Sequence, residues 1–220
     1  MEWEVSQKPA YTLLKIRLRH GESVTSEAGA FVAGFGDYDI KTQTGGVFSA
    51  LARKLTGGES IFLNTYMSRG DSELWFAPSL PGDIEYLEID GGLIVQDMSY
   101  LVHHGDIKVT VEWRGLKGLF AEGELVWLKL LGRGGVWVNS YGGMERIDLG
   151  AGERFILDNF HFVAMDDTVK YNIKKFGGWK SFILGGEGLV MEVRGPGRVL
   201  VQTRSLPIFA RIINKIIGRG

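Results

Sequence analysis

The sequence predicts an all-β protein of three tandem β-helix or sandwich-like repeats, followed by a C-terminal amphipathic α-helix. An apolar run opens three times, and an aromatic residue follows each opening residue by seven positions: Val24 and Phe31, Leu93 and Tyr100, Phe155 and Phe162. A short Gly/Glu-rich segment, here called the Gly/Glu-rich step, also recurs three times and ends in an apolar residue. These apolar residues, Ile61, Leu125 and Leu189, are 64 positions apart. Self-similarity at a fixed period is the signature of a repeat architecture.

The repeats span about residues 21–80, 90–143 and 151–204. Their joints, around Pro81 and Gly142, are too short to act as domain linkers. We therefore expect one β domain over residues 1–220 with three lobes. The 32 glycines of the chain, about twice the usual share, indicate many tight turns between short strands.

Before the first repeat, residues 11–19 alternate between apolar and basic side chains. Leu14, Ile16 and Leu18 share one face, and Lys15 and Arg17 share the other. Strict alternation is typical of a strand with one buried face. The segment should therefore form a half-buried strand.

A helix is predicted over residues 205–218. Ser205 can cap it, Pro207 suits its first turn and Gly218 suits its end. Two adjacent rows at i, i+4 spacing give it an apolar stripe: Ile208, Phe209, Ile212, Ile213, Ile216 and Ile217. Covering these six side chains is worth up to about 10 kcal/mol. Three surfaces can cover them: the chain's own sheet, a neighbouring subunit or a membrane surface.

Composition excludes several classes of protein. A net charge of −1 and a pI of about 6.4 disfavour nucleic acid as a partner. The absence of cysteine excludes disulfides, thiolate catalysis and cysteine-ligated zinc. The N-terminus shows no secretory signal, and no apolar stretch approaches the roughly 20 residues of a spanning helix. A cytoplasmic protein is expected.

The histidines do not form a metal motif. His103 and His104 are neighbours, and on a strand neighbouring side chains point to opposite faces. Because Gly105 and Asp106 follow, a solvated turn is the preferred interpretation. His161 and Asp158 would likewise lie on opposite faces of a strand.

Other candidate chemistry also has a structural interpretation. Four glutamates recur at the Gly/Glu-rich step, which favours a structural role, since catalysis needs one constellation: Glu59, Glu122, Glu124 and Glu187. Gly177–Ser181 resembles a phosphate loop but has Trp179 where the loop needs glycine. Trp75 and Trp137 could stack on bases, although packing is the simpler role. We predict no catalytic residue, no metal and no cofactor.

Several motifs together resemble the Altered Inheritance of Mitochondria protein 24 family. The most specific lie in the third repeat: Gly186–Leu189, Gly195–Val199 and Gln202–Ser205. Glu122-Gly123-Glu124 departs from the Gly-Glu-Gly expected in the second repeat. The resemblance implies a β-helical fold similar to the tryptophan RNA-binding attenuation protein, with subunits in rings or trimers. It supplies no catalytic residues, and mitochondrial relatives are linked to inner-membrane organisation.

These observations lead to a non-enzymatic, homo-oligomeric scaffold or interaction protein. Its C-terminal helix is the expected contact with a neighbour or with a membrane surface. The alternative is a module that binds RNA or a small ligand, which the implied fold suggests.

Overall fold

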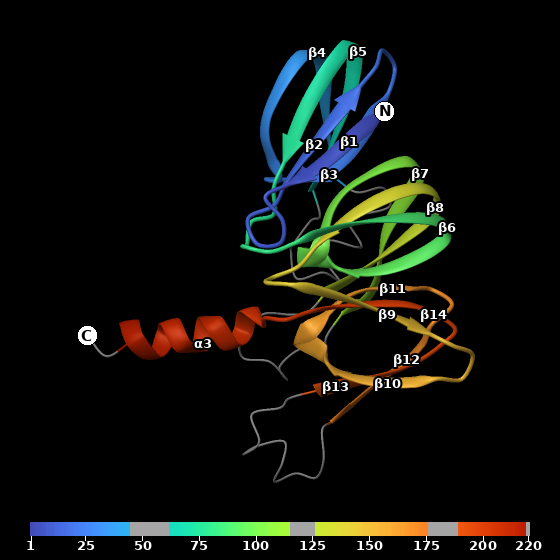
Figure 1. Ribbon diagram of the computed structural model, residues 1–220, viewed down its shortest axis with the longest axis vertical. Helices are drawn as coiled ribbons and strands as arrows, with labels where there is room; N and C mark the ends of the chain where they lie inside the picture. The colour runs from blue at the N-terminus through green and yellow to red at the C-terminus, as the bar shows by residue number, and fades with distance from the viewer. Residues whose placement is uncertain (45–61, 115–125, 176–188, 219–220) are drawn as a thin grey trace.

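The protein is described from a computed structural model that covers residues 1–44, 62–114, 126–175 and 189–218. It is mostly β, with a large antiparallel sheet and a C-terminal helix, which confirms the predicted class. Figure 1 shows three groups of strands stacked along the long axis, and the helix leaves the body beside the third group. The Gly/Glu-rich steps fall outside the described residues, except for Leu189.

The strand groups follow chain order. The first contains β1 (Glu2–Ser6), β2 (Leu13–Leu18), β3 (Ser23–Glu27), β4 (Phe31–Thr44) and β5 (Phe62–Phe76). The second contains β6 (Ile84–Gln96), the short 3-10 helix η1 (Asp97–Ser99), β7 (Tyr100–Arg114) and β8 (Val126–Asn139). The third contains β9 (Met144–Leu149), β10 (Arg154–Asp158), the 3-10 helix η2 (Asn159–His161), β11 (Phe162–Asp166), β12 (Lys170–Lys175), β13 (Leu189–Arg194) and β14 (Gly197–Gln202). Helix α3 (Leu206–Ile217) follows.

One sheet runs through all three groups. Its order is β1-β2-β5-β3-β7-β8-β6-β11-β14-β9, and β4 pairs with β5 beside this path. The pairing of β3 with β7 joins the first group to the second, and the pairing of β6 with β11 joins the second to the third. A second, three-stranded sheet, β10-β13-β12, belongs to the third group.

The core consists of three hydrophobic clusters, each centred on one strand group. Strand β2 contributes to the first of them as predicted, because Leu14, Ile16 and Leu18 are buried while Arg17 is exposed. The clusters also share residues across the joints. Trp137 of the second group packs in the first cluster, and Trp127 packs in the third. The groups therefore form a continuous body.

Glycine has a role within the strands that the sequence did not reveal. Strands β4 to β8 are 13 to 15 residues long, so the expectation of short strands joined by tight turns was wrong for this part of the chain. Gly105 of β7 pairs with Gly134 of β8, and both have positive φ, +91° and +159°. A Cβ on Gly105 would lie 2.6 Å from the carbonyl oxygen of Arg133. Glycine here permits close approach of two paired backbones.

Candidate functional site

Helix α3 forms close to where it was predicted, over Leu206–Ile217. Ser205 stands at the N-cap, Pro207 lies in the first turn and Lys215 lies in the last turn. Proline has no N–H to lose there, and a cation suits the negative end of the helix dipole. Within the described residues, no helix has the length and hydropathy needed to cross a bilayer.

The apolar stripe of α3 is open to solvent. The exposed fractions are 49% for Ile208, 45% for Phe209, 52% for Ile212, 67% for Ile216 and 72% for Ile217. Ile213 is half-buried, and none of the helix residues is buried. The alternative in which the chain's own sheet covers the stripe is therefore wrong for this structure.

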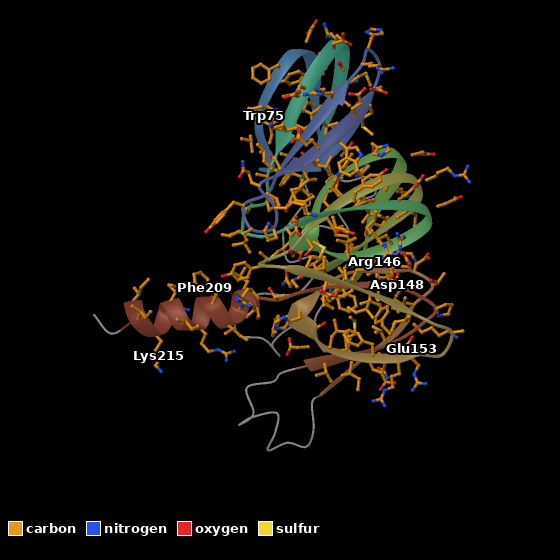
Figure 2. All side chains as sticks on the ribbon, in the orientation of Figure 1. Trp75, Arg146, Asp148, Glu153, Phe209 and Lys215 are labelled. Atoms are coloured by element: carbon orange, nitrogen blue, oxygen red, sulfur yellow. The ribbon has the colours of Figure 1, made fainter. Side chains whose placement is uncertain are left out.

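The contacts of α3 with the body lie at its first turns. Phe209 packs edge-on against Tyr141, with 6.1 Å between the ring centroids. Figure 2 shows Phe209 and Lys215 on different sides of the helix as it projects from the body. The rest of the apolar stripe therefore remains available to another surface.

A buried polar cluster holds the first strand group against the second. His103 and Tyr100 of β7 are 6% and 0% exposed. The Tyr100 hydroxyl donates to the carbonyl oxygen of Thr25 on β3 (3.1 Å) and lies 2.7 Å from Nδ1 of His103. Because Tyr100 uses its proton on Thr25, Nδ1–H of His103 is the donor in the second bond. The expectation of a solvated turn at His103 and His104 was wrong.

Burial sets the charge states in this cluster. It lowers the pKa of His103 to about 4, and repulsion from His104 adds to this effect. Burial also raises the pKa of Glu27, at the end of β3, to about 7, and Asp97 contributes further. The pKa of Tyr100 is raised well above its ordinary value by burial and by Glu27. At neutral pH Tyr100 and His103 are uncharged, which suits a packing role between strands.

His104 and His161 also have structural partners. The ring of His104 stacks on Tyr86, with Nε2 3.1 Å from the phenol oxygen. His161 lies in η2, where its Nδ1 is 2.7 Å from the carbonyl oxygen of Gln202. Asp158 caps the same turn by accepting from the N–H of Phe160. The prediction that His161 and Asp158 occupy opposite faces of one strand was therefore wrong.

The two tryptophans occupy different environments. Trp137 is fully buried and packs against Trp3 and Tyr86, at centroid distances of 5.7 and 5.1 Å. Trp75 is half-buried, packs edge-on against Phe35 and donates from Nε1 to Glu73 (2.7 Å). Both engage neighbouring side chains, so packing accounts for their positions.

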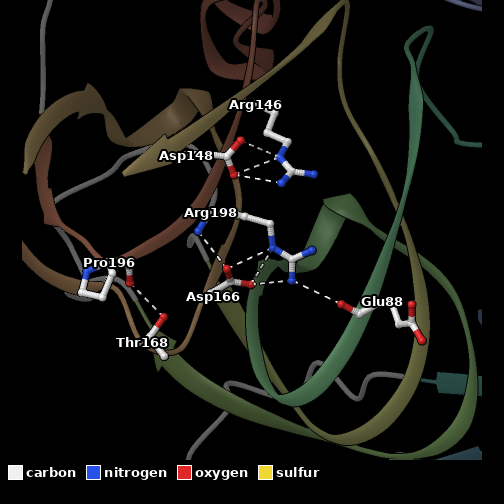
Figure 3. Close-up of polar contacts among 7 residues, drawn as sticks. All are labelled: Glu88, Arg146, Asp148, Asp166, Thr168, Pro196 and Arg198. Carbon is white, nitrogen blue, oxygen red and sulfur yellow. Dashed lines mark hydrogen bonds and ion pairs between the residues drawn. The ribbon is translucent and has the colours of Figure 1, made fainter. Parts of the chain in front are cut away.

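Arg198 forms an ion pair within the third strand group and a hydrogen bond to the second (Figure 3). Arg198 of β14 donates through Nε and Nη2 to the carboxylate of Asp166 on β11, at 2.7 to 3.0 Å. Nη2 also reaches the carbonyl oxygen of Glu88 on β6, at 3.2 Å. The hydrogen bond to Asp166, followed by its charge, raises the pKa of Arg198. The ion pair therefore connects two strands of the third group, and the hydrogen bond to Glu88 reaches across the joint.

The other sequence candidates can be placed only in part. Among the described residues, no group of three or more His, Asp or Glu side chains is arranged to hold a metal ion. Glu59, Glu122, Glu124 and Glu187 lie outside the described residues, as does the segment Gly177–Ser181. A pocket beside the first turn of α3 was not foreseen, because its lining comes from segments far apart in the sequence.

Comparison with known proteins identifies relatives over almost the whole chain. An uncharacterized protein of Streptococcus pyogenes serotype M6 is 30% identical over 227 aligned residues, which cover 99% of this chain and 91% of the relative. A Streptococcus pyogenes protein of known crystal structure has the same fold. It is 30% identical, with a TM-score of 0.81 over 98% of this chain and 99% of that chain.

A family match agrees with the resemblance seen in the sequence. The model of the family described as Mitochondrial biogenesis AIM24 matches residues 3–204, which include all three strand groups and stop just before α3. The chain belongs to the Mitochondrial biogenesis AIM24 family.

Proposed function

We propose that this protein is a non-enzymatic scaffold that assembles with further copies of itself through the apolar stripe of α3. The observation that carries the proposal is the exposure of Ile208, Phe209, Ile212, Ile216 and Ile217 on a helix that projects from the body. Covering a half-exposed large apolar side chain is worth about 1 kcal/mol, so these four isoleucines and one phenylalanine favour association with an apolar partner.

The proposed body is a tandem array of three related β-units. Two described features support this. Helix η1 ends one residue before Tyr100, and η2 ends one residue before Phe162, so each short helix occupies the last three positions of the seven-residue spacing seen in the sequence. In the first unit, Gly29 takes positive φ (+96°) just before Phe31. A ring or trimer of such subunits is the assembly that the family resemblance implies.

Peripheral attachment to an anionic membrane surface is the second candidate. The observation that favours it is charge: no acidic residue follows Glu192, whereas α3 carries Arg211 and Lys215 opposite its apolar stripe. A basic amphipathic helix binds in the plane of an anionic interface. The two candidates use the same stripe and therefore need separate measurements.

Two variants with the same added charge test the assembly. Ile212→Glu places a carboxylate in the apolar stripe, and Asn214→Glu places one at an exposed position outside it. We expect light scattering to show an oligomer for the unaltered chain and for Asn214→Glu, and a single chain for Ile212→Glu. A monomeric unaltered chain, or an Ile212→Glu variant that assembles normally, contradicts the proposal.

Co-sedimentation with vesicles tests the second candidate on the same three proteins. Binding to phosphatidylglycerol vesicles, with none to phosphatidylcholine vesicles, supports attachment if Ile212→Glu abolishes it. Failure of all three proteins to sediment with either vesicle rules it out.

A further inference from the structure

A small cavity, partly open to solvent, lies where α3 leaves the body. Its volume is about 120 Å³. The second strand group supplies Gln96 and Met98, the following connection supplies Tyr141, η2 supplies Phe160, and α3 supplies Leu206 and Pro207. Most of this wall is apolar. An apolar cavity of about 150 Å³ holds one benzene molecule, so this one suits a single six-membered ring.

Hydrogen bonds hold the wall of the cavity in place. The amide of Gln202 accepts from the N–H of Tyr141 (2.8 Å) and donates to the carbonyl oxygen of Phe160 (2.9 Å). Nδ2 of Asn139 donates to the carbonyl oxygen of Met98 (3.0 Å). The cavity is therefore formed before any ligand arrives, which lowers the entropic cost of binding.

A buried polar group that lacks a partner in the described part of the chain lines this cavity. Gln96 lines it, is 6% exposed, and has an Oε1 atom without a hydrogen-bond partner among the described residues. Two further buried residues, Asn159 (1% exposed) and Ser205 (6% exposed), directly precede the lining residues Phe160 and Leu206 in the sequence. Their side-chain polar atoms also lack hydrogen-bond partners among the described residues. Leaving a buried polar group unpaired costs about 1–3 kcal/mol, so a ligand that satisfies one gains that amount.

We propose that this cavity binds a small uncharged ring compound that carries an O–H or N–H donor. The apolar wall takes the ring, and Gln96 accepts the hydrogen bond. The terminal amide torsion of glutamine is soft, so a rotation can present the oxygen to the cavity. Asp97 also lines the cavity and disfavours an anionic ligand.

Such a ligand would contact the first turn of α3 directly. Because Leu206 and Pro207 are part of the wall, occupancy stabilises the attachment of the helix to the body. A bound ligand would therefore hold α3 in one orientation relative to the body. Binding itself is independent of assembly, so the two proposals fail separately.

Phenol and fluorobenzene are matched probes, because they have nearly equal size and only phenol has a donor. Ligand-observed NMR on the full chain should show saturable binding of phenol with a dissociation constant of about 1 mM. We expect fluorobenzene to bind about five- to tenfold more weakly. Benzoate should not bind.

Two variants assign the binding to this cavity. Gln96→Leu should bring phenol to the affinity of fluorobenzene, and Leu80→Trp, which fills the cavity from its lining, should abolish binding of both. Leu131→Trp, at a position 40% exposed on β8, is the control and should bind as the unaltered chain does. Circular dichroism verifies that each variant is folded.

Three results would overturn the proposal. The first is no saturable binding of phenol up to about 10 mM, ten times the expected constant. The second is a preference for phenol that survives Gln96→Leu in a folded protein. The third is binding that persists in folded Leu80→Trp, which would place the probe elsewhere.

Discussion

Replacing Arg198 with alanine should destabilise the protein far more than replacing Arg146, although each arginine is paired with an aspartate (Figure 3). The Arg198 guanidinium makes three contacts with Asp166 and one with the carbonyl oxygen of Glu88. Arg198 is 24% exposed and Asp166 is 18% exposed. The substitution leaves the Asp166 carboxylate largely out of water, with the backbone N–H of residue 198 as its remaining partner among the described residues.

The size of the effect follows from this burial. Breaking a fully buried ion pair costs about 3–5 kcal/mol, because one charge is left uncompensated. The pair here keeps some access to water, and one backbone hydrogen bond survives, so we expect a loss of about 2–3 kcal/mol. For a chain of this length, that corresponds to a lowering of Tm by about 4–12 °C.

Arg146→Ala is the control. Arg146 and Asp148 lie on β9 with exposed fractions of 46% and 63%, and exposed pairs contribute at most about 1 kcal/mol. Urea unfolding of both variants, followed by circular dichroism, measures the two losses. Equal losses, or a loss below about 1 kcal/mol for Arg198→Ala, would refute the view that the partly buried pair of Arg198 and Asp166 stabilises the fold.

Two further predictions concern charge and packing in the core. The raised pKa of Glu27, about 7, makes its contribution to stability fall as pH rises from about 4.5 to 7, because the folded chain holds that proton more tightly. The lowered pKa of His103, about 4, makes its contribution rise between about pH 4 and 6.5. The free energy of unfolding of Glu27→Gln, relative to that of the unaltered chain, should therefore rise by about 2–3 kcal/mol as pH rises through its window, and that of His103→Gln should fall by a similar amount. Urea unfolding from pH 4 to 8 measures both. The same pH dependence of stability in the variants and in the unaltered chain would contradict this. Trp137→Ala should cost about 3–5 kcal/mol in the same assay, and Trp75→Ala, at a half-buried position, clearly less; equal losses would show that burial does not distinguish the two sites.

Features that depend on local sequence were predictable. The alternation of Leu14, Ile16 and Leu18 identifies the buried face of β2, because strand periodicity is a property of the chain itself. Ser205 and Gly218 likewise stand at the ends of α3 as predicted, although the Ser205 side chain makes no capping hydrogen bond. The family was also identified from motifs in the third repeat.

Features that depend on distant segments were not predictable. Gly105 suggested a turn after His104, but the opposing glycines of β8 allow both strands to continue, and His103 becomes buried against β3. The cavity beside α3 could not be predicted from the sequence, because its lining residues Gln96, Tyr141 and Leu206 belong to no common motif. Burial of Glu27 likewise depends on what packs around the end of β3. None of these relations leaves a periodic signal in the sequence.

Sedimentation velocity of the full chain beside a chain that ends at Ser205 tests the central claim most directly. The comparison is clean because no residue of α3 is buried and none belongs to a core cluster. We predict an oligomer for the full chain and a folded single chain for the shortened one. Identical sedimentation of the two proteins, whether both assemble or both stay single, would contradict the role given to α3.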